Sequence, residues 1–425
     1  MPLLYALQWV AFHLGMLITI PVVVGNALHL DPVGVATLTQ RVFFFTGLAS
    51  LLQVFIGHRL LLIEGPAAPW WAAYVILASI TAQMGVSFAL LRTDLEGAML
   101  VAGAMLMAAA LLGLLRRLLP LFTPAINGTV LLLLSLQIGG IGVKGILNSG
   151  SGRALDGRLV VIALVVLLLI VFLSLRARGV WRTGAVIFGV AGGWLLYHLW
   201  GFQANGNTMR PGTSLLSLPG VFPWGLPTFN PGIIFSLVLL GIVLIPNAVI
   251  SITAMESLIN TQLPRFYYDR GLFVSGLSDF LAGLFASVGS IPFTSSVGLV
   301  AISGVKERLP FILATLIFML AGLLPAVGAL VARIPPPVAN AVLLASASPL
   351  AIYALKDYAR CPLNNRDAFV IGLSLLIGTG IMLLPGETWQ QLPGWAANIL
   401  GNGVIAGSLS CILMEHLVLP RPLRR

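Results

Sequence analysis

The sequence predicts an all-α polytopic membrane protein with 14 transmembrane segments, arranged as 7+7 inverted repeats with short extended stretches in broken segments 3 and 10. Three observations predict this class. Hydrophobic residues make up 58% of the chain and charged residues 8%, whereas about 25% charged is ordinary in soluble domains. Apolar runs of about 20 residues, enough to cross about 30 Å of hydrocarbon, recur from end to end. Gly and Pro interrupt two of these runs at corresponding positions.

The apolar runs give the expected segments in chain order. Helices are expected at residues 4–24, 34–56, 60–79, 95–116, 121–142, 158–175, 181–200, 232–256, 271–288, 293–305, 309–331, 337–355, 367–384 and 396–417. The first run has no basic region before it and no small-residue cleavage site after it. We therefore interpret it as a retained helix and not as a signal peptide.

The loops carry the basic residues unevenly. With successive loops on alternate sides, 16 Lys and Arg lie on the side of both termini and 6 on the other, while Arg41 falls inside a helix. This bias predicts cytoplasmic termini and an even number of segments. The expected location is the plasma (bacterial inner) membrane. The net charge of +10 then follows from loop topology, so no nucleic-acid partner is expected.

Two similar motifs indicate an internal repeat. Segment 5 opens with a Pro-x-x-Asn pattern at Pro124 and Asn127, and segment 12 repeats the pattern at Pro337 and Asn340. Seven segments separate the two motifs, and an odd separation predicts halves that face opposite ways. The alternative is chance, because Pro commonly begins helices. The expected division is a first seven-segment repeat at 1–202, an exterior linker at 203–230 and a second repeat at 231–425.

Segments 3 and 10 are the broken pair. Residues 64–69 read Glu-Gly-Pro-Ala-Ala-Pro, and residues 289–296 read Gly-Ser-Ile-Pro-Phe-Thr-Ser-Ser. We expect extended backbone before Gly65 and at 291–293, with helices that begin near Ala67 and Thr294. Irregular backbone at membrane depth is tolerated where it lines a cavity. The helix N-termini would then point their positive dipole ends into a binding site.

Several short motifs resemble those of one transporter family. Asn364-Asn365-Arg366-Asp367, followed by an aromatic residue and an apolar run, is similar to a junction written N-S-R-N, aromatic, I-I-G. On physical grounds Asn365 and Asp367 can cap the helix that follows. Three further stretches of this chain match motifs of the same family. Gln8-Trp9 is similar to its Gln-His pair, and residues 122–130 are similar to its P-P-x-x-T-G-T-V helix. Residues 334–338 are similar to its I-P-x-P-V motif. The chain thus resembles, over nearly its whole length, the nucleobase–ascorbate transporter (nucleobase-cation symporter-2) family, and in particular its bacterial purine permeases.

This resemblance implies a core domain (segments 1–4 and 8–11), a gate domain (segments 5–7 and 12–14) and a substrate between segments 3, 8 and 10. The sequence departs from the family where Asn247 replaces a glutamate and where Ser295 replaces a Gln or Glu. Asn and Ser can hydrogen-bond a heterocycle, but they cannot carry a proton. The substrate-binding residues that the resemblance implies are Asn247 and Ser295 by their side chains, Ala68 and Thr294 by backbone groups, and Met16 and Ser251 as wall.

Glu64 is the one carboxylate that the sequence places near mid-membrane. It lies about 17 Å of extended chain past Arg59, the expected cytoplasmic edge. A carboxylate at that depth is a functional hypothesis by default, so Glu64 is the proton-coupling candidate. The alternatives are a structural ion pair with Arg41 and a more peripheral position.

Four other residues carry expectations. His13 is expected to be a buried hydrogen-bonding residue, and Glu256 to be solvated near the cytoplasmic face. Trp70 and Trp71 are expected to pack in the core or at the membrane interface. The alternative is that one of the two rings stacks on a base.

The predicted function is secondary active transport of a nucleobase, with a purine favoured, coupled to protons and driven by alternating access. The alternative is a uniporter or small-anion transporter of the same fold without proton coupling. An intramembrane enzyme is disfavoured, because the sequence has no HExxH, no Asp-rich pair and no G-x-S-x-G. No catalytic residue or cofactor is expected. No metal site is expected either, since Cys361 and Cys411 are far apart and form no CxxC pair. The expected partners are the substrate, protons and the bilayer, with a homodimer left open.

Overall fold

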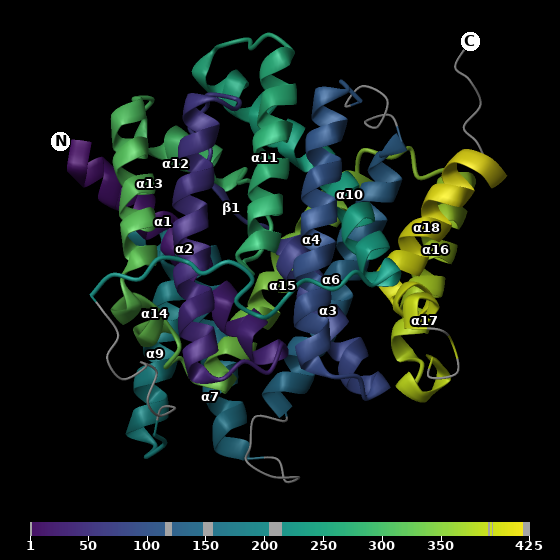
Figure 1. Ribbon diagram of the computed structural model, residues 1–425, viewed down its shortest axis with the longest axis horizontal. Coiled ribbons are helices and arrows are strands. Elements are labelled where there is room, and N and C mark those ends of the chain that lie inside the picture. Colours follow the sequence, from purple (N-terminus) through teal and green to yellow (C-terminus); the bar gives the residue numbers. More distant parts are fainter. Residues whose placement is uncertain are drawn as a thin grey trace.

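The computed structural model describes residues 2–114, 121–147, 156–203, 215–389, 392 and 394–419. Its helices lie side by side around a buried two-stranded ribbon (Figure 1). The first half contains α1 (Pro2–Ala27), α2 (Pro32–Phe55), β1 (Glu64–Pro66), α3 (Ala68–Met84), α4 (Phe88–Leu111), α6 (Pro124–Leu147), α7 (Gly157–Arg176), α8 (Val180–Thr183) and α9 (Ala185–Leu199). The second half contains α10 (Pro231–Ile259), α11 (Phe266–Leu284), β2 (Ser290–Pro292), α12 (Ser295–Ser303), α13 (Arg308–Leu323), α14 (Pro325–Val331), α15 (Pro336–Tyr358), α16 (Asn365–Leu383), the 3-10 turn η2 (Gly386–Trp389), α17 (Gly394–Leu400), α18 (Gly403–Leu413) and the π-helical turn η3 (Met414–Val418).

Membrane-length helices dominate the described chain, which confirms the predicted class. Among the described residues, eight helices are long and apolar enough to cross a membrane, and α13 with α14 makes a ninth span if that bent pair is counted as one. The number of 14 segments stays a prediction. Segments 7 and 14, expected as single helices, are divided into α8 with α9 and α17 with α18.

Segment 11 is also not the continuous helix that was expected. It bends by 84° between α13 and α14. Leu324 is extended, with φ −93° and ψ 108°, and Pro325 begins the next helix. A proline disfavours helical backbone at the preceding residue and cannot donate an N–H. Pro325 therefore favours a break at this position.

The two broken segments form the antiparallel ribbon at the centre of the protein. Glu64 lies opposite Pro292, Gly65 opposite Ile291 and Pro66 opposite Ser290. The helices α3 and α12 begin directly after the strands, so the predicted change from extended to helical backbone is confirmed in both segments. A Cβ on Gly65 would lie 2.7 Å from two ring atoms of Phe293. Only glycine allows this approach.

Helices from the two halves pack against each other in pairs. The two helices that carry the Pro-x-x-Asn motifs, α6 and α15, pack together, as do α2 with α13 and α4 with α11. At the α4–α11 crossing a Cβ on Gly103 would lie 2.3 Å from the backbone N of Phe280. Such close backbone approach through small residues is typical of helix packing in membranes.

The polar junction before α16 anchors the C-terminal helices. Asn364, and not Asn365, is the N-cap, and its side chain accepts a 2.8 Å hydrogen bond from the N–H of Asp367. Arg366 then lies 2.9 Å from the carboxylate of Asp367 and 3.0 Å from that of Glu415. Its Nε also donates to the carbonyl of Leu419 at 2.6 Å. The motif is thus a structural clamp between α16 and the turn η3.

Candidate binding cavity

A cavity of about 580 Å³ opens beside the central ribbon. It is lined by residues of α1, α10, β2 and the first turns of α3 and α12, and also by residues of α6, α7, α9 and α15. Helices from both halves of the chain therefore enclose it. The volume is in the ordinary range for a small-molecule site.

The ends of two helices lie at this cavity. Ala67 is the N-cap of α3 and Thr294 that of α12, and neither helix start is capped by a side chain. Both N-caps line the cavity. The first N–H groups of a helix have no partner within the helix, and they carry the positive end of its dipole. Pro69 has no N–H, and the N–H groups of Trp70, Ser296 and Val297 donate to carbonyls at the helix starts. The two helix starts therefore bring the positive ends of their dipoles to the cavity.

Four of the predicted substrate-binding residues line the cavity. They are Met16, Asn247, Thr294 and Ser295, which come from α1, α10 and the start of α12. The backbone of Ala68 begins α3 between the lining residues Ala67 and Pro69, and its side chain lies outside the described part of the structure.

Ser251 does not line the wall as expected. It is fully buried behind the wall. Its Oγ lies 2.9 Å from the carbonyl of Pro292 and 2.6 Å from the hydroxyl of Thr294. The next turn of α10 after Asn247 is covered by the chain that leaves β2, so Ser251 contacts that chain. It can hold Thr294 in place but does not reach the cavity.

Glu64 is buried in a network of neutral polar groups and does not line the cavity. Its carboxylate accepts hydrogen bonds from Gln53 Nε2 at 2.9 Å and from Ser275 Oγ at 2.7 Å. Its backbone N–H donates to Ser50 Oγ at 2.9 Å. These partners place Glu64 between α2 and α11. Glu64 is therefore not peripheral, and it does not face the cavity.

The ion pair between Glu64 and Arg41 is not formed. The buried guanidinium of Arg41 instead lies 5.6 Å from the centre of the Trp224 ring, and the nearby charge is that of Glu96. Arg41 and Gln53 are on the same helix, and helical rise separates them by roughly 18 Å. Because Gln53 contacts Glu64, Arg41 is too far along α2 to reach it.

The sequence interpretation missed another deeply buried carboxylate, which lies beside the central ribbon. Asp279 on α11 is 1% exposed and accepts a 2.8 Å hydrogen bond from the backbone N–H of Ser290. The Oγ of Ser290 donates to Ser278 at 2.7 Å. Ser275, Ser278 and Asp279 are spaced three and four residues apart, so they lie on one face of α11. Polar residues at that spacing on an apolar helix were the signal that could have found them.

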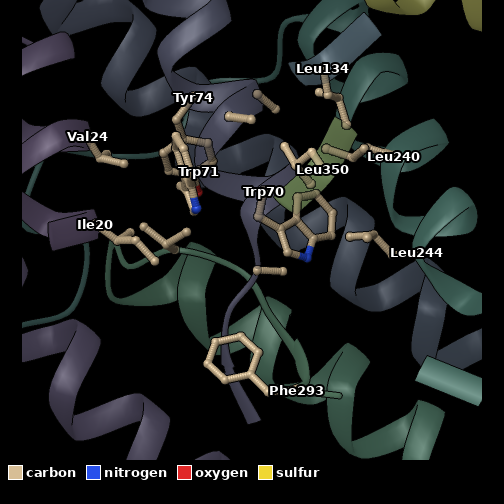
Figure 2. Close-up of a cluster of buried hydrophobic side chains, with 14 of the residues drawn as sticks. Ile20, Val24, Trp70, Trp71, Tyr74, Leu134, Leu240, Leu244, Phe293 and Leu350 are labelled. Carbon is tan, nitrogen blue, oxygen red and sulfur yellow. The ribbon is translucent and has the colours of Figure 1, made fainter. Parts of the chain in front are cut away.

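Three of the four remaining expectations hold. His13 is buried, with Nδ1 3.1 Å from the carbonyl of Trp9 and Nε2 3.3 Å from Ser296 Oγ. Trp70 and Trp71 are buried in the apolar core (Figure 2). Glu256 is not solvated: it is buried, and its carboxylate accepts hydrogen bonds from the N–H of Leu263 and the hydroxyl of Tyr268. These two partners replace water.

The last turn of α15 forms the mouth of the cavity. Tyr353, Lys356, Asp357 and Arg360 line it there. Arg360 pairs with Asp357 at 3.2 Å. Among the described residues that line the cavity, Asp357 is the one carboxylate. The deeper part of the cavity is therefore lined by neutral residues.

Broken helices that meet at a cavity are typical of membrane transporters. The family model described as "Permease family" (Xan_ur_permease) matches residues 2–387, and the chain belongs to this family. It is 30% identical to the putative purine permease YwdJ of Bacillus subtilis over 98% of this chain and 96% of that protein. It is 25% identical to the xanthine permease XanP of Escherichia coli over 95% and 88% of the two chains.

Solved structures show the same fold. The transmembrane domain of the cyanobacterial bicarbonate transporter BicA matches with a TM-score of 0.66 at 15% identity, over 96% of this chain and 97% of that one. The murine anion transporter Slc26a9 matches with a TM-score of 0.63 at 15% identity, over 97% and 67%. The chain thus has the 7+7 inverted-repeat transporter fold that the sequence predicts.

Proposed function

We propose that this protein is a proton-coupled secondary active transporter of a nucleobase, with a purine as its substrate. The observation that carries the proposal is the meeting of Asn247, Thr294 and Ser295 with two uncapped helix starts in one cavity. A planar heterocycle with polar edges fits such a site, because apolar walls bury its faces and a few convergent polar groups orient it. Names of the relatives, purine permease and xanthine permease, support the choice of a purine.

Alternating access is proposed to occur between a core domain (α1–α4 and α10–α14) and a gate domain (α6–α9 and α15–α18). In support, elements of both proposed domains line the cavity. The protein is proposed to lie in the bacterial plasma membrane with both termini in the cytoplasm. The cavity mouth at Lys356 and Arg360 then belongs to the side rich in basic residues, so the described conformation is open to the cytoplasm.

Glu64 is proposed to carry the coupled proton. It is fully buried, it contacts Gln53 and Ser275, and its strand leads directly into α3 at the cavity. The carboxyl group of Glu64 is neutral when it is protonated and negatively charged when it is deprotonated. The side chains of Asn247 and Ser295 cannot change charge in this way. Movement of the proton would alter the hydrogen bonds that hold β1 in place.

A second candidate is a uniporter or small-anion transporter without proton coupling. It is favoured by the neutral lining of the deep cavity, since Asp357 at the mouth is the one lining carboxylate in the described chain. This candidate needs no role for Glu64 in transport.

Reconstitution in liposomes tests both candidates. Uptake of radiolabelled xanthine, adenine, uracil and bicarbonate is measured with an inward proton gradient and again after a protonophore collapses it. We expect saturable purine uptake that the gradient stimulates. Purine uptake that ignores the gradient would favour the uniporter, and bicarbonate uptake without purine uptake would overturn the nucleobase proposal. The Asn247→Ala protein is the control for transport through this cavity.

A further inference from the structure

The chain that leads into α10 lies across the core helices as an extended segment. We call residues 217–230 the strap; they run without a helix or strand and cross the view in front of α2 and α4, in teal (Figure 1). The backbone N–H of Ser217 donates to the carbonyl of Leu323, the last residue of α13, at 2.9 Å. The N–H of Phe222 donates to the carbonyl of Leu284, the last residue of α11, also at 2.9 Å. The first part of the strap is therefore tied to the ends of two core helices.

The second part of the strap packs on α4. Thr228 donates its backbone N–H to the carbonyl of Thr93 at 3.2 Å. The hydroxyl of Thr228 lies 2.8 Å from that of Thr93 and donates to the carboxylate of Asp94 at 2.6 Å. One turn further along α4, Gly97 leaves room for the carbonyl of Thr228, with which a Cβ would collide. Backbone, hydroxyl and glycine contacts thus hold the strap directly against this helix.

Trp224 of the strap serves two buried charged residues of the core. Its backbone N–H donates to the carboxylate of Glu96 at 3.2 Å, and its ring lies 5.6 Å from the guanidinium of Arg41. Arg41 is 4% and Glu96 is 1% exposed. Removing a partner from a buried charge is strongly unfavourable. Release of the strap would therefore take partners away from both residues.

We propose that the strap is a fixed part of the core domain and stays docked on α4 throughout the transport cycle. This inference rests on the alternating access of the proposed function. The partners of the strap named above lie on α2, α4, α11 and α13, which all belong to the proposed core. The strap and these helices then move as one body relative to α6, α7, α9 and α15. Arg41 and Glu96 act in this docking and not on the substrate.

A disulfide between the strap and α4 tests the proposal. Thr93→Cys and Thr228→Cys place sulfur atoms where two hydroxyl oxygens are 2.8 Å apart, so a small adjustment allows the bond. The double variant is reconstituted in liposomes, and mass spectrometry measures its cross-linked fraction. The initial rate of xanthine uptake is compared between oxidised and reduced samples of the same protein, which cancels the effect of the cysteines themselves. We expect the two rates to agree within about twofold, because the disulfide joins two parts of one moving body.

Gly15→Cys with Val186→Cys is the control, because this pair joins α1 of the core to α9 of the gate. A Cβ on Gly15 would lie 3.2 Å from the Cβ of Val186, close to the separation of about 3.5–4.5 Å in disulfides. Oxidation of the control pair should lower xanthine uptake by at least about tenfold, since the two domains can no longer move past each other. Reduction should restore it.

Two results would overturn the inference. Loss of uptake on oxidation of the 93–228 pair, with recovery on reduction, would show that the strap leaves α4 during transport. Failure of this pair to cross-link would show that the two side chains are not held together. Failure of the proposed function looks different: wild-type protein takes up no xanthine, or the oxidised control transports as fast as the reduced control.

Discussion

Ser275 on α11 donates a 2.7 Å hydrogen bond to the carboxylate of Glu64 on β1, and Gln53 on α2 donates a second at 2.9 Å. The contact between Ser275 and Glu64 joins the two halves of the chain at the centre of the protein. It gives a buried carboxyl group two neutral partners and no basic one. The group can therefore gain or lose a proton without breaking an ion pair.

Glu64→Gln tests the proposed coupling. Glutamine has nearly the same shape but cannot release a proton, so stimulation of uptake by an inward proton gradient should disappear. Exchange of substrate across the membrane, which needs no net proton movement, should stay within about twofold. Ser275→Ala is the control, because it removes a hydrogen bond and leaves the titratable group. Unchanged proton dependence in Glu64→Gln protein of normal abundance would show that Glu64 is structural.

Asn247→Ala should weaken substrate binding by about 1–3 kcal/mol, because a substrate group loses its buried polar partner. Equilibrium binding to purified protein measures the change. Asn340→Ala is the matched control: Asn340 lies on α15 against Gly145 of α6 and does not line the cavity. Equal losses in the two variants would mean that Asn247 acts through stability and not through contact.

Gly65→Ala should destabilise the protein by about 1–3 kcal/mol, the usual cost of overpacking. The new methyl group would lie 2.7 Å from the ring of Phe293 and push it towards the cavity that it lines. Thermal unfolding in detergent measures the loss, and substrate affinity should fall with it. Gly298→Ala on α12 is the control, since a Cβ there meets no atom within 4 Å. A melting temperature equal to that of wild type in Gly65→Ala would contradict the predicted clash.

Arg366→Ala should destabilise the C-terminal helices by on the order of 3 kcal/mol, because two buried carboxylates lose their cation. The side chains of Asp367 and Glu415 are 2% and 1% exposed. Arg360→Ala removes a pair whose arginine is 62% exposed and should cost about 0–1 kcal/mol. Melting temperatures in one detergent compare the two variants. Similar shifts would argue against the buried clamp.

The positions of the breaks and of most helices followed from local properties of the chain. Gly and Pro at 64–69 and 289–296 restrict the backbone wherever they occur, so the strands and the starts of α3 and α12 could be placed from the sequence. Segment 11 is the exception. Its apolar run predicts one helix, but Leu324 is extended and Pro325 begins a new helix within the run.

The sequence by itself determined the membrane class, the repeat and the region of the candidate cavity, because apolar length and backbone restriction are local. Only the tertiary structure decided that Ser251 contacts Thr294, that Glu64 is bonded to Gln53 and Ser275 rather than Arg41, and that Trp71 lines the cavity. The reason is physical. A membrane helix is apolar towards both lipid and protein, so its residue pattern does not fix the rotation that selects each side chain's partners.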